Sequence, residues 1–252
     1  MVQQTVRRVF VTGGGGYIGS VLVRMLLQQG YEVRVLDRLF WGEQPLKEWR
    51  ESAEVILGDI RNFDDRWLDG VDAVIHMAGL SNDPTAEYNP DANWQMNAVA
   101  SEKLAEACLR KGIARMTFGS SCSVYDGLPP DLMHDENAVL NPRGAYAQSK
   151  FYSEAKIRKL AGPNFQPVIF RQGTVYGPSP RMRFDLVVNT FVKDALRGGR
   201  LKLHGGGWMH RPLVAVEDVC RAHIAGLEAP EELVNGQVFN VVYTNYQIRE
   251  LA

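Results

Sequence analysis

The chain has 252 residues, of which 45% are hydrophobic and 23% are charged. Its 28 Lys and Arg residues nearly balance 29 Asp and Glu residues, which excludes a general polyanion binder because no basic excess is available to neutralise the phosphates of a nucleic acid. The three cysteines lie far apart in the sequence, so they predict neither a disulfide framework nor a metal cluster.

Targeting signals are not predicted either. The N-terminus from Met1 to Arg8 is polar and leads directly into a predicted strand, which is not the pattern of a signal peptide. No apolar run approaches the roughly 18 residues that a membrane-spanning helix requires. With so few cysteines, we expect a cytoplasmic protein that has no membrane partner.

A glycine-rich turn follows the first predicted strand, residues 8–12. Apolar residues at helical spacing come next, and strand, glycine turn and helix is the order that a dinucleotide site requires. Gly13 permits the tight turn, Gly16 lets the backbone approach a pyrophosphate, and Gly19 lets the helix pack close to the strand. The helix N-terminus then offers free N–H groups and a positive dipole end to the phosphates. The candidate cofactor residues here are Gly13, Gly16, Tyr17, Ile18 and Gly19.

An acidic residue, Asp37, ends the second predicted strand, residues 32–36. A carboxylate at this place can accept both ribose hydroxyls of an adenosine and repels a 2′-phosphate, which favours NAD over NADP. Arg38 follows directly and keeps the alternative open, because an arginine can pair with that phosphate or stack on adenine. Both residues are candidate cofactor contacts.

Two further strands are predicted at residues 54–57 and 72–76. The first closes on Asp59 and Ile60, a turn whose carboxylate would reach the adenine amino group. The second is followed by Met77, Ala78 and Gly79, which would let the middle of the cofactor lie close to the backbone. Ser81 then lies in a loop at the carboxyl edge of the predicted sheet, where ligands bind in open α/β folds, although turn chemistry alone also explains it.

Two polar residues occupy apolar positions, and we expect a different role for each. His76 ends the fourth strand and is expected to pack there rather than to act as a catalyst. Asn97 lies on the apolar side of a helix predicted from 91 to 111, so its amide should be tied to backbone near the active site, and it is a candidate cofactor residue. A fifth strand is predicted at 113–119, and this alternation of strands with helices predicts a parallel sheet wound on both faces.

A serine, a tyrosine and a lysine carry the predicted chemistry. Ser121 follows the fifth strand, while Tyr146 and Lys150 share one face of a helix predicted at 145–160. An ammonium beside a phenol favours the ionised phenol, which makes Tyr146 a usable base, and Ser121 can hydrogen-bond the oxygen that the phenolate deprotonates. The three residues predict a site that removes a proton from a hydroxyl while a hydride leaves the same carbon.

The motifs follow one another as Thr12-Gly-Gly-x-Gly16-Tyr-Ile-Gly19, Asp37, Gly58-Asp59, His76-x-Ala78, Ser120-Ser121-x-x-Val124-Tyr125, Tyr146-x-x-x-Lys150, Tyr176-Gly177-Pro178 and Arg211-Pro-Leu-Val-x-Val216-x-Asp218-Val219. In this order they resemble the extended short-chain dehydrogenase/reductases, most of all the NAD-dependent epimerase/dehydratase branch that acts on nucleotide-diphosphate sugars. The resemblance implies a Rossmann-type doubly wound parallel sheet with a smaller C-terminal substrate-binding lobe. It also implies that Tyr146 is the base, that Lys150 holds the nicotinamide ribose and depresses the tyrosine pKa, and that Ser121 binds the reacting hydroxyl.

One departure from the family pattern narrows the chemistry. Members that dehydrate a sugar usually carry an Asp-Glu pair directly after the catalytic serine or threonine, whereas Cys122 and Ser123 stand here. A thiol titrates near ~8.5 and an alcohol far higher, so neither is a good general acid near pH 7. A 4,6-dehydratase is therefore disfavoured. Both residues are candidate substrate contacts, and Cys122 is interpreted as a small buried neighbour of the serine rather than as a reactive thiol.

The second half supplies further candidate substrate contacts. Arg143 precedes the tyrosine helix, and Arg181 and Arg183 lie in a loop rich in Gly, Pro and Arg, where a guanidinium can pair with a diphosphate or remain solvated. Asn189 lies on the next predicted helix, but the Asn-Leu/Ile-x-Pro sequence common there in the family is missing. By the resemblance, Arg211 aligns with an arginine that contacts the substrate diphosphate.

The predicted organisation has two parts. Residues 1–172 form the NAD-binding domain, with 204–222 returning to it, and residues 173–203 and 223–252 form the lobe, which is expected to be incomplete at its C-terminal end. The elements predicted in this half are strands at 167–171, 201–203, 212–214 and 238–242 and helices at 184–196 and 217–227, with another helix beginning near residue 246. By the resemblance, a homodimer is expected through the helices near 98–109 and 147–157.

Three functions remain open at this point. An NAD-dependent nucleotide-sugar 4-epimerase is favoured, and a 4-keto-sugar reductase or other sugar-nucleotide dehydrogenase using NAD(P)H is the alternative. A non-enzymatic dinucleotide sensor belongs to another class, but such a protein has no need for Ser121, Tyr146 and Lys150 together.

Overall fold

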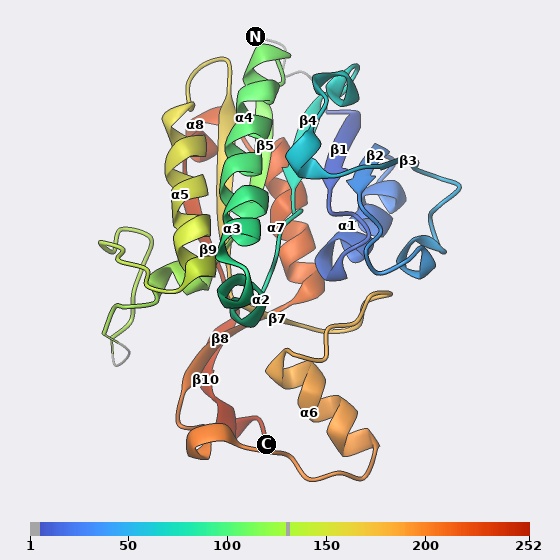
Figure 1. The fold of residues 1–252 in the computed structure, drawn as a ribbon. Helices are drawn as coiled ribbons and strands as arrows, with labels where there is room; N and C mark the ends of the chain where they lie inside the picture. Colours follow the sequence, from blue (N-terminus) through green and yellow to red (C-terminus); the bar gives the residue numbers. More distant parts are fainter. Residues whose placement is uncertain (1–5, 130–131) are drawn as a thin grey trace.

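A sheet of seven parallel strands forms the centre of the molecule (Figure 1). The computed structural model describes residues 6–129 and 132–252, so the expectation for the polar start of the chain lies largely outside it. The strands are ordered β3-β2-β1-β4-β5-β6-β9. Their bounds are β1 Arg8–Thr12, β2 Glu32–Asp37, β3 Glu54–Leu57, β4 Ala73–His76, β5 Arg115–Ser121, β6 Gln166–Gln172 and β9 Val238–Val241.

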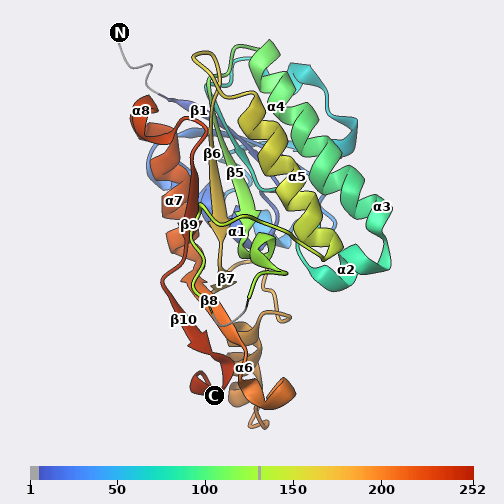
Figure 2. The same ribbon diagram turned by 90° about the vertical axis from the view of Figure 1, so that its left-hand side faces the viewer.

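Helices cover both faces of this sheet (Figure 2), with α1 and α7 on one face and α4 and α5 on the other. The helices are α1 Tyr17–Gln28, α2 Asp83–Tyr88, α3 Pro90–Asn93, α4 Ala100–Arg110, α5 Ala145–Lys159, α6 Val187–Leu196, α7 Val216–Glu228 and α8 Glu231–Val234. A π-helical turn, Trp94–Val99, joins α3 to α4. Short 3-10 turns lie at Gln44–Leu46, Ile60–Asn62, Asp65–Leu68, Cys122–Tyr125, His204–Gly207 and Ile248–Glu250.

The central strands are apolar on both faces because both faces are covered. In β1, Val9 and Val11 join the core beneath α1 and α7, whereas Phe10 between them joins the core beneath α4 and α5. All three side chains are fully buried. This arrangement explains why the strands read as continuous apolar runs instead of alternating with polar residues.

The strand order reverses at β1, which lies between β2 and β4. Thr12 and His76, the last residues of β1 and β4, are paired in register. In open α/β sheets a crevice forms at the carboxyl ends of the strands at such a reversal, and ligands bind there. The predicted Rossmann-type fold is confirmed, and it places the glycine turn after β1 at that crevice.

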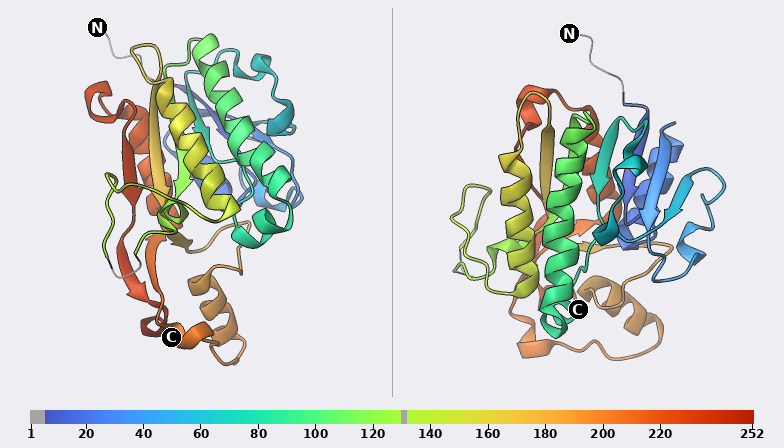
Figure 3. Two further views of the ribbon diagram at one scale, coloured as in Figure 1. Left: turned by 60° about the vertical axis from the view of Figure 1, so that its left-hand side comes forward. Right: turned by 45° about the horizontal axis from the view of Figure 1, so that its top comes forward.

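A smaller sheet, ordered β10-β8-β7, lies beyond this edge together with α6 (Figures 1 and 3). Its strands are β7 Thr174–Tyr176, β8 His210–Ala215 and β10 Thr244–Gln247. Sequence reasoning missed β7 and β10, and the strand predicted at 201–203 does not form. The helix predicted to begin near residue 246 was also wrong, because β10 pairs antiparallel with β8 and only a 3-10 turn follows it.

The predicted boundaries of the two parts were wrong in two places. β9 was assigned to the lobe, but it pairs with β6 and completes the large sheet. β8 was assigned to the NAD-binding domain, but it is the middle strand of the small sheet. After residue 172 the strands and helices no longer alternate regularly, and the sequence did not show how often the chain returns to the large sheet. The chain passes between the two parts more often than predicted.

Candidate active site

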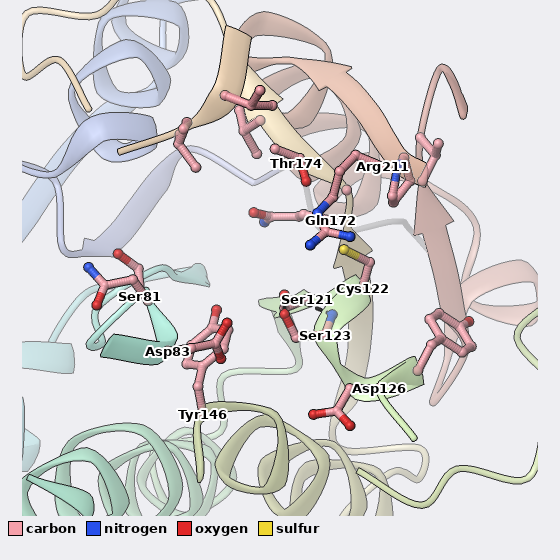
Figure 4. Close-up of a pocket in the computed structure, with 18 of the residues that line it drawn as sticks. Ser81, Asp83, Ser121, Cys122, Ser123, Asp126, Tyr146, Gln172, Thr174 and Arg211 are labelled. Carbon is pink, nitrogen blue, oxygen red and sulfur yellow. Dashed lines mark hydrogen bonds between the residues drawn. The ribbon is translucent and has the colours of Figure 1, made fainter. Parts of the chain in front are cut away.

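A pocket of about 1250 Å³ opens between the carboxyl edge of the large sheet and the smaller sheet. Residues from four separate stretches face it in Figure 4: Ser81 and Asp83 after β4, Ser121, Cys122 and Ser123 at the end of β5, Tyr146 on α5, and Arg211 on β8. Tyr17 and Ile18, at the start of α1, also line it. The fold thus brings six of the ten predicted catalytic and substrate-contacting residues to one cavity.

The glycine turn has the geometry of a phosphate-binding loop. Gly13 has a φ of 76°, and a Cβ on it would lie 2.8 Å from the Ala78 nitrogen. A Cβ on Gly19 would lie 2.1 Å from the Gly13 oxygen, so α1 can approach the turn only through a glycine. Gly16 is the N-cap of α1 and provides no side-chain cap, which leaves the first N–H groups of the helix for an anion. These residues fit the diphosphate of a dinucleotide.

Asp37 fixes the backbone around the predicted ribose position. One of its carboxylate oxygens accepts from the Gly15 N–H and the other from the Leu39 N–H, each at 2.8 Å. Arg38 turns toward Asp59, with 3.4 Å between its Nε and the carboxylate. Because the Asp37 carboxylate adjoins the glycine turn and Arg38 is paired with Asp59, the geometry favours a free ribose hydroxyl over a 2′-phosphate.

Thr12 is a structural residue that sequence reasoning did not single out. Its Oγ1 accepts from the N–H groups of Met77 and Ala78 at 3.2 and 3.1 Å and lies 2.6 Å from His76 Nδ1. The other ring nitrogen of His76 contacts Ser101 at 2.8 Å. Burial lowers the pKa of His76 to about 3, so a neutral imidazole is packed there, as expected. The loop after β4 is held to the end of β1 in this way.

Asn97 holds the next part of the same loop. Its Oδ1 accepts from the Leu80 N–H at 2.8 Å, and its Nδ2 donates to the Leu80 carbonyl at 2.9 Å. A Cβ on Gly79 would lie 2.5 Å from that Oδ1, which explains the glycine. The expectation that the Asn97 amide is tied to backbone is confirmed. The Asn97 side chain is fully buried and holds the loop after β4 in place.

The three predicted catalytic residues converge from β5 and α5. Ser121 and Tyr146 both line the pocket. Lys150 lies behind them, where its Nζ donates to the Gly119 carbonyl at 2.8 Å and stands 6.0 Å from the centre of the Tyr146 ring. The helical spacing of Tyr146 and Lys150 therefore directs both side chains toward the end of β5, as predicted from the sequence.

Burial controls the ionisation of this group. Burial raises the pKa of Tyr146 to about 12, and the Ser121 hydroxyl offsets part of that increase. Burial lowers the pKa of Lys150 to about 8, and the Glu154 carboxylate works in the opposite direction. On balance the pKa of Tyr146 is raised, because desolvation of the phenolate outweighs the stabilisation by the Ser121 hydroxyl and the Arg183 charge.

The residues after the catalytic serine behave as the sequence indicated. Ser121 and Ser123 hydroxyl oxygens lie 3.2 Å apart, and Ser121 also accepts from the Ser123 N–H. Cys122 is partly buried, and burial raises the pKa of its thiol to about 11. A neutral thiol and two alcohols therefore form this wall of the pocket.

Two arginines face the pocket. Arg211 lines it, and within the part of the chain that the structure describes its guanidinium donates to the neighbouring His210 carbonyl at 2.9 Å. Arg183 also lines it, pairs with Asp185 and donates to the Ser81 hydroxyl at 3.1 Å. Arg183 belongs to the loop that sequence reasoning singled out, and it is the arginine of that loop that reaches the pocket.

Three predicted substrate residues do not line this pocket. Arg181 stacks on Trp41, with its guanidinium carbon 3.9 Å from the ring centre. Arg143 is exposed just before α5, where its N–H donates to Asp126 and its carbonyl accepts from Gln148. Asn189 is buried and bonds to Tyr17, Gly177 and the Arg183 carbonyl. Arg181 and Asn189 belong to the segment after β7 that points Arg183 into the pocket, whereas Arg143 lies just before α5, so none of the three lines the cavity.

Within residues 6–129 and 132–252, no group of His, Cys, Asp and Glu side chains has the arrangement needed to hold a metal ion. Over the same residues, none of the helices is both long and apolar enough to span a bilayer.

Comparisons with known proteins agree with this site. The NAD dependent epimerase/dehydratase family matches residues 9–241. Over 234 residues the chain is 31% identical to a putative UDP-glucose 4-epimerase of Methanocaldococcus jannaschii, an alignment that covers 90% of this chain and 75% of that protein.

Two solved structures share the fold but differ in reaction. A double mutant of a dTDP-glucose 4,6-dehydratase from Streptomyces venezuelae, with NAD bound, has a TM-score of 0.86 and 29% identity, covering 97% of this chain and 78% of that chain. The UDP-glucose 4-epimerase of Thermotoga maritima with UDP-glucose has a TM-score of 0.87 and 25% identity, covering 97% and 80%. With its glycine turn, its Ser-Tyr-Lys site and these relatives, the chain belongs to the NAD-dependent epimerase/dehydratase family and is an NAD-dependent enzyme that modifies nucleotide sugars.

Proposed function

We propose that the protein is an NAD-dependent nucleotide-sugar 4-epimerase. The observation that carries the proposal is an intact Ser121, Tyr146 and Lys150 site followed by Cys122 and Ser123. With the pKa of the Cys122 thiol raised to about 11, neither neighbour is suited to general acid catalysis near pH 7. The site therefore has the groups needed to oxidise a carbinol and reduce the ketone again, and Cys122 and Ser123 do not supply the acid and base of an elimination.

The residues divide the chemistry between them. NAD, when bound, supplies a hydride acceptor and a positively charged ring at this edge of the sheet. Tyr146 accepts the proton of the 4-hydroxyl, and Ser121 hydrogen-bonds the oxygen as it becomes a carbonyl. Lys150 keeps a positive charge behind the phenol, which favours the phenolate in the transition state. Reversal of these proton movements on the other face of the 4-keto sugar completes the inversion.

The pocket supports a reorientation of the sugar. Its volume of about 1250 Å³ exceeds the ~300–1,000 Å³ usual for small-molecule sites, so a hexose ring has room to turn. We assign the diphosphate to Arg183 and Arg211, because guanidinium groups match phosphate oxygens and both line the pocket. The diphosphate would remain fixed while the sugar rotates about its bond to it.

The test is interconversion of C4 epimers by purified protein without added NADH. The epimerase proposal predicts that catalytic NAD suffices, since each hydride returns to the sugar. A 4-keto-sugar reductase would instead consume one NADH for each product. Turnover that requires one NADH for each product would contradict the 4-epimerase and support the 4-keto-sugar reductase.

We also propose that the protein is a homodimer through α4 and α5. These helices lie side by side on the outer face of the sheet (Figure 3), and Leu109 and Phe151 are each more than one third exposed on them. Light scattering of the purified protein tests this assignment. A monomeric mass that persists at micromolar concentration would overturn it.

A further inference from the structure

A buried ion pair lies directly behind the catalytic residues. Arg171 of β6 meets Glu154 of α5 with two hydrogen bonds, Nη2 to Oε2 at 2.8 Å and Nε to Oε1 at 3.1 Å. The two side chains are 4% and 3% exposed. Because burying two charges costs several kcal/mol that the pair only partly recovers, an ion pair at this depth is weak evidence for a role in stability alone.

Glu154 reaches the strand that carries the catalytic serine. The Ser120 hydroxyl donates to Glu154 Oε1 at 2.5 Å, and the preceding residue, Gly119, accepts from Lys150 at 2.8 Å. Two consecutive residues of β5 are thus held by side chains one turn apart on α5. Ser121 is the next residue, so its position relative to Tyr146 on the same helix depends on these two contacts.

Arg171 extends the same network to the opposite wall of the pocket. Its Nη1 donates to the Tyr125 hydroxyl at 2.9 Å, which in turn donates to Asn240 Oδ1 at 2.7 Å. Tyr125 and Asn240 both line the pocket. The ion pair therefore links the catalytic helix, the end of β5 and the wall formed by β9 through groups that are already hydrogen-bonded.

Glu154 also lies four residues after Lys150 on α5, so the carboxylate and the ammonium share one face of the helix. The titratable groups that face Lys150 are Tyr146 and Glu154 on its own helix, His76 from β4 and His223 from α7. Both histidines are fully buried, and desolvation lowers the pKa of each to about 3, so they are neutral near pH 7. Among the residues described in the structure, Glu154 is therefore the counter-charge for the ammonium.

We propose that Glu154, held by Arg171, is a positioning residue that orients Ser121 and supplies the negative charge that retains the Lys150 ammonium during the reaction. The proposal rests on the roles assigned to Ser121, Tyr146 and Lys150 and adds a residue that contacts neither substrate nor cofactor. It predicts an effect on the pH dependence of turnover, which a purely structural ion pair would not produce.

The test is the pH profile of kcat for Glu154→Gln, an isosteric change that retains an acceptor for Ser120. Removing the charge should move the alkaline limb of the profile toward neutral, because the Glu154 carboxylate raises the pKa of Lys150. Glu102→Gln is the matched control, since Glu102 pairs with Lys156 of α5 at 2.7 Å in a partly exposed position. Its alkaline limb should not move.

A uniform loss of kcat with an unchanged alkaline limb in Glu154→Gln would overturn the proposal. If this variant fails to fold, Glu154→Gln combined with Arg171→Met removes both charges and leaves no unpaired guanidinium. The double variant should show a limb displaced in the same direction by a smaller amount, because loss of the Arg171 charge offsets part of the effect, and an unmoved limb there would equally overturn the proposal. Failure of the proposed function can be told apart from failure of the Glu154 proposal. Full activity in Tyr146→Phe would show that Tyr146 is not the base, whatever the result for Glu154.

Discussion

The Lys150 ammonium donates to the Gly119 carbonyl oxygen at 2.8 Å. That bond ties α5 to β5 immediately before Ser121, and it holds the lysine 6.0 Å from the centre of the Tyr146 ring. The helix that carries the base and the strand that carries the serine are therefore aligned by the lysine itself. Lys150 acts in this account both as a charge and as a structural link.

Replacing Tyr146 with Phe should reduce kcat by about 100-fold or more, because loss of a positioned general base typically costs 10²- to 10⁴-fold. Tyr152→Phe is the matched control. Tyr152 lies on the same helix, and its hydroxyl donates to Glu102 at 2.8 Å, away from the pocket. Steady-state kinetics on a nucleotide sugar should give the control a rate within about threefold of wild type. Comparable losses in both variants would show that the helix, and not the phenol, was disturbed.

Asp83 tests whether the pocket holds a second acid. Burial and the neighbouring carboxylates Asp126 and Glu87 raise its pKa, and Arg211 partly offsets them. Asp126 and Glu87 have structural partners, since they accept from the Gly144 and Ala145 N–H groups at 2.9 and 2.8 Å at the start of α5.

Because epimerisation needs one proton acceptor at C4, Asp83→Asn should lower kcat/KM by less than about tenfold. Kinetics of this variant beside Tyr146→Phe provide the check. A loss as large as that of Tyr146→Phe would assign Asp83 an essential acid–base role and argue for elimination chemistry.

Acid should destabilise the protein partly through His76 and His223. Desolvation lowers the pKa of each from 6.5 to about 3 in the folded state. Between these values the unfolded chain binds more protons, so stability is full above pH 6.5 and is lost as the pH falls toward 3. Each histidine would contribute roughly 2 kcal/mol of this loss at pH 5.

Urea unfolding at pH 7 and pH 5 measures this effect. His223→Gln, which can still reach the Thr117 hydroxyl that His223 contacts at 2.8 Å, should show a smaller fall in the unfolding midpoint than wild type. Equal falls in the two proteins would mean that His223 does not contribute to acid unfolding.

Asp37→Asn should weaken NAD binding about 10-fold or more and narrow the preference for NAD over NADP, because a charged acceptor contributes about 1.5 to 3 kcal/mol to a hydrogen bond. Isothermal titration with both dinucleotides measures the change. Asp65→Asn, which alters an exposed carboxylate paired with Arg110, serves as the control. Unchanged affinity for both dinucleotides in Asp37→Asn would remove Asp37 from the ribose site.

The large sheet and the Ser-Tyr-Lys group could be predicted from local patterns. The turn at Gly13 requires a positive φ and free backbone space, which only a glycine provides, and the spacing of Tyr146 and Lys150 places both on one helical face. Both requirements involve only residues that are close together in the sequence, so they can be recognised from the sequence. The position of Ser121 follows from the same logic, because a mostly apolar strand precedes it.

The smaller sheet and the arginines were harder to predict because they depend on long-range pairing. β7 and β10 are each held by β8 and carry no strong pattern of their own. Asn189 fixes the backbone of this loop and so determines which arginine reaches the pocket. Its amide donates to the Arg183 carbonyl at 3.0 Å and to the Tyr17 hydroxyl at 3.1 Å. From the sequence alone, Arg181 and Arg183 were equally good candidates for contacting the diphosphate, since both lie in the same loop.

Turnover of nucleotide sugars in D₂O, followed by mass spectrometry and NMR of the product, tests the central claim most directly. If Ser121, Tyr146 and Lys150 carry out a 4-epimerisation, the hydride leaves C4 and returns to C4, so the product is the C4 epimer with no deuterium on carbon. Deuterium at C5 or C6, or a product lighter by one water, would contradict the account and show that the pocket performs an elimination.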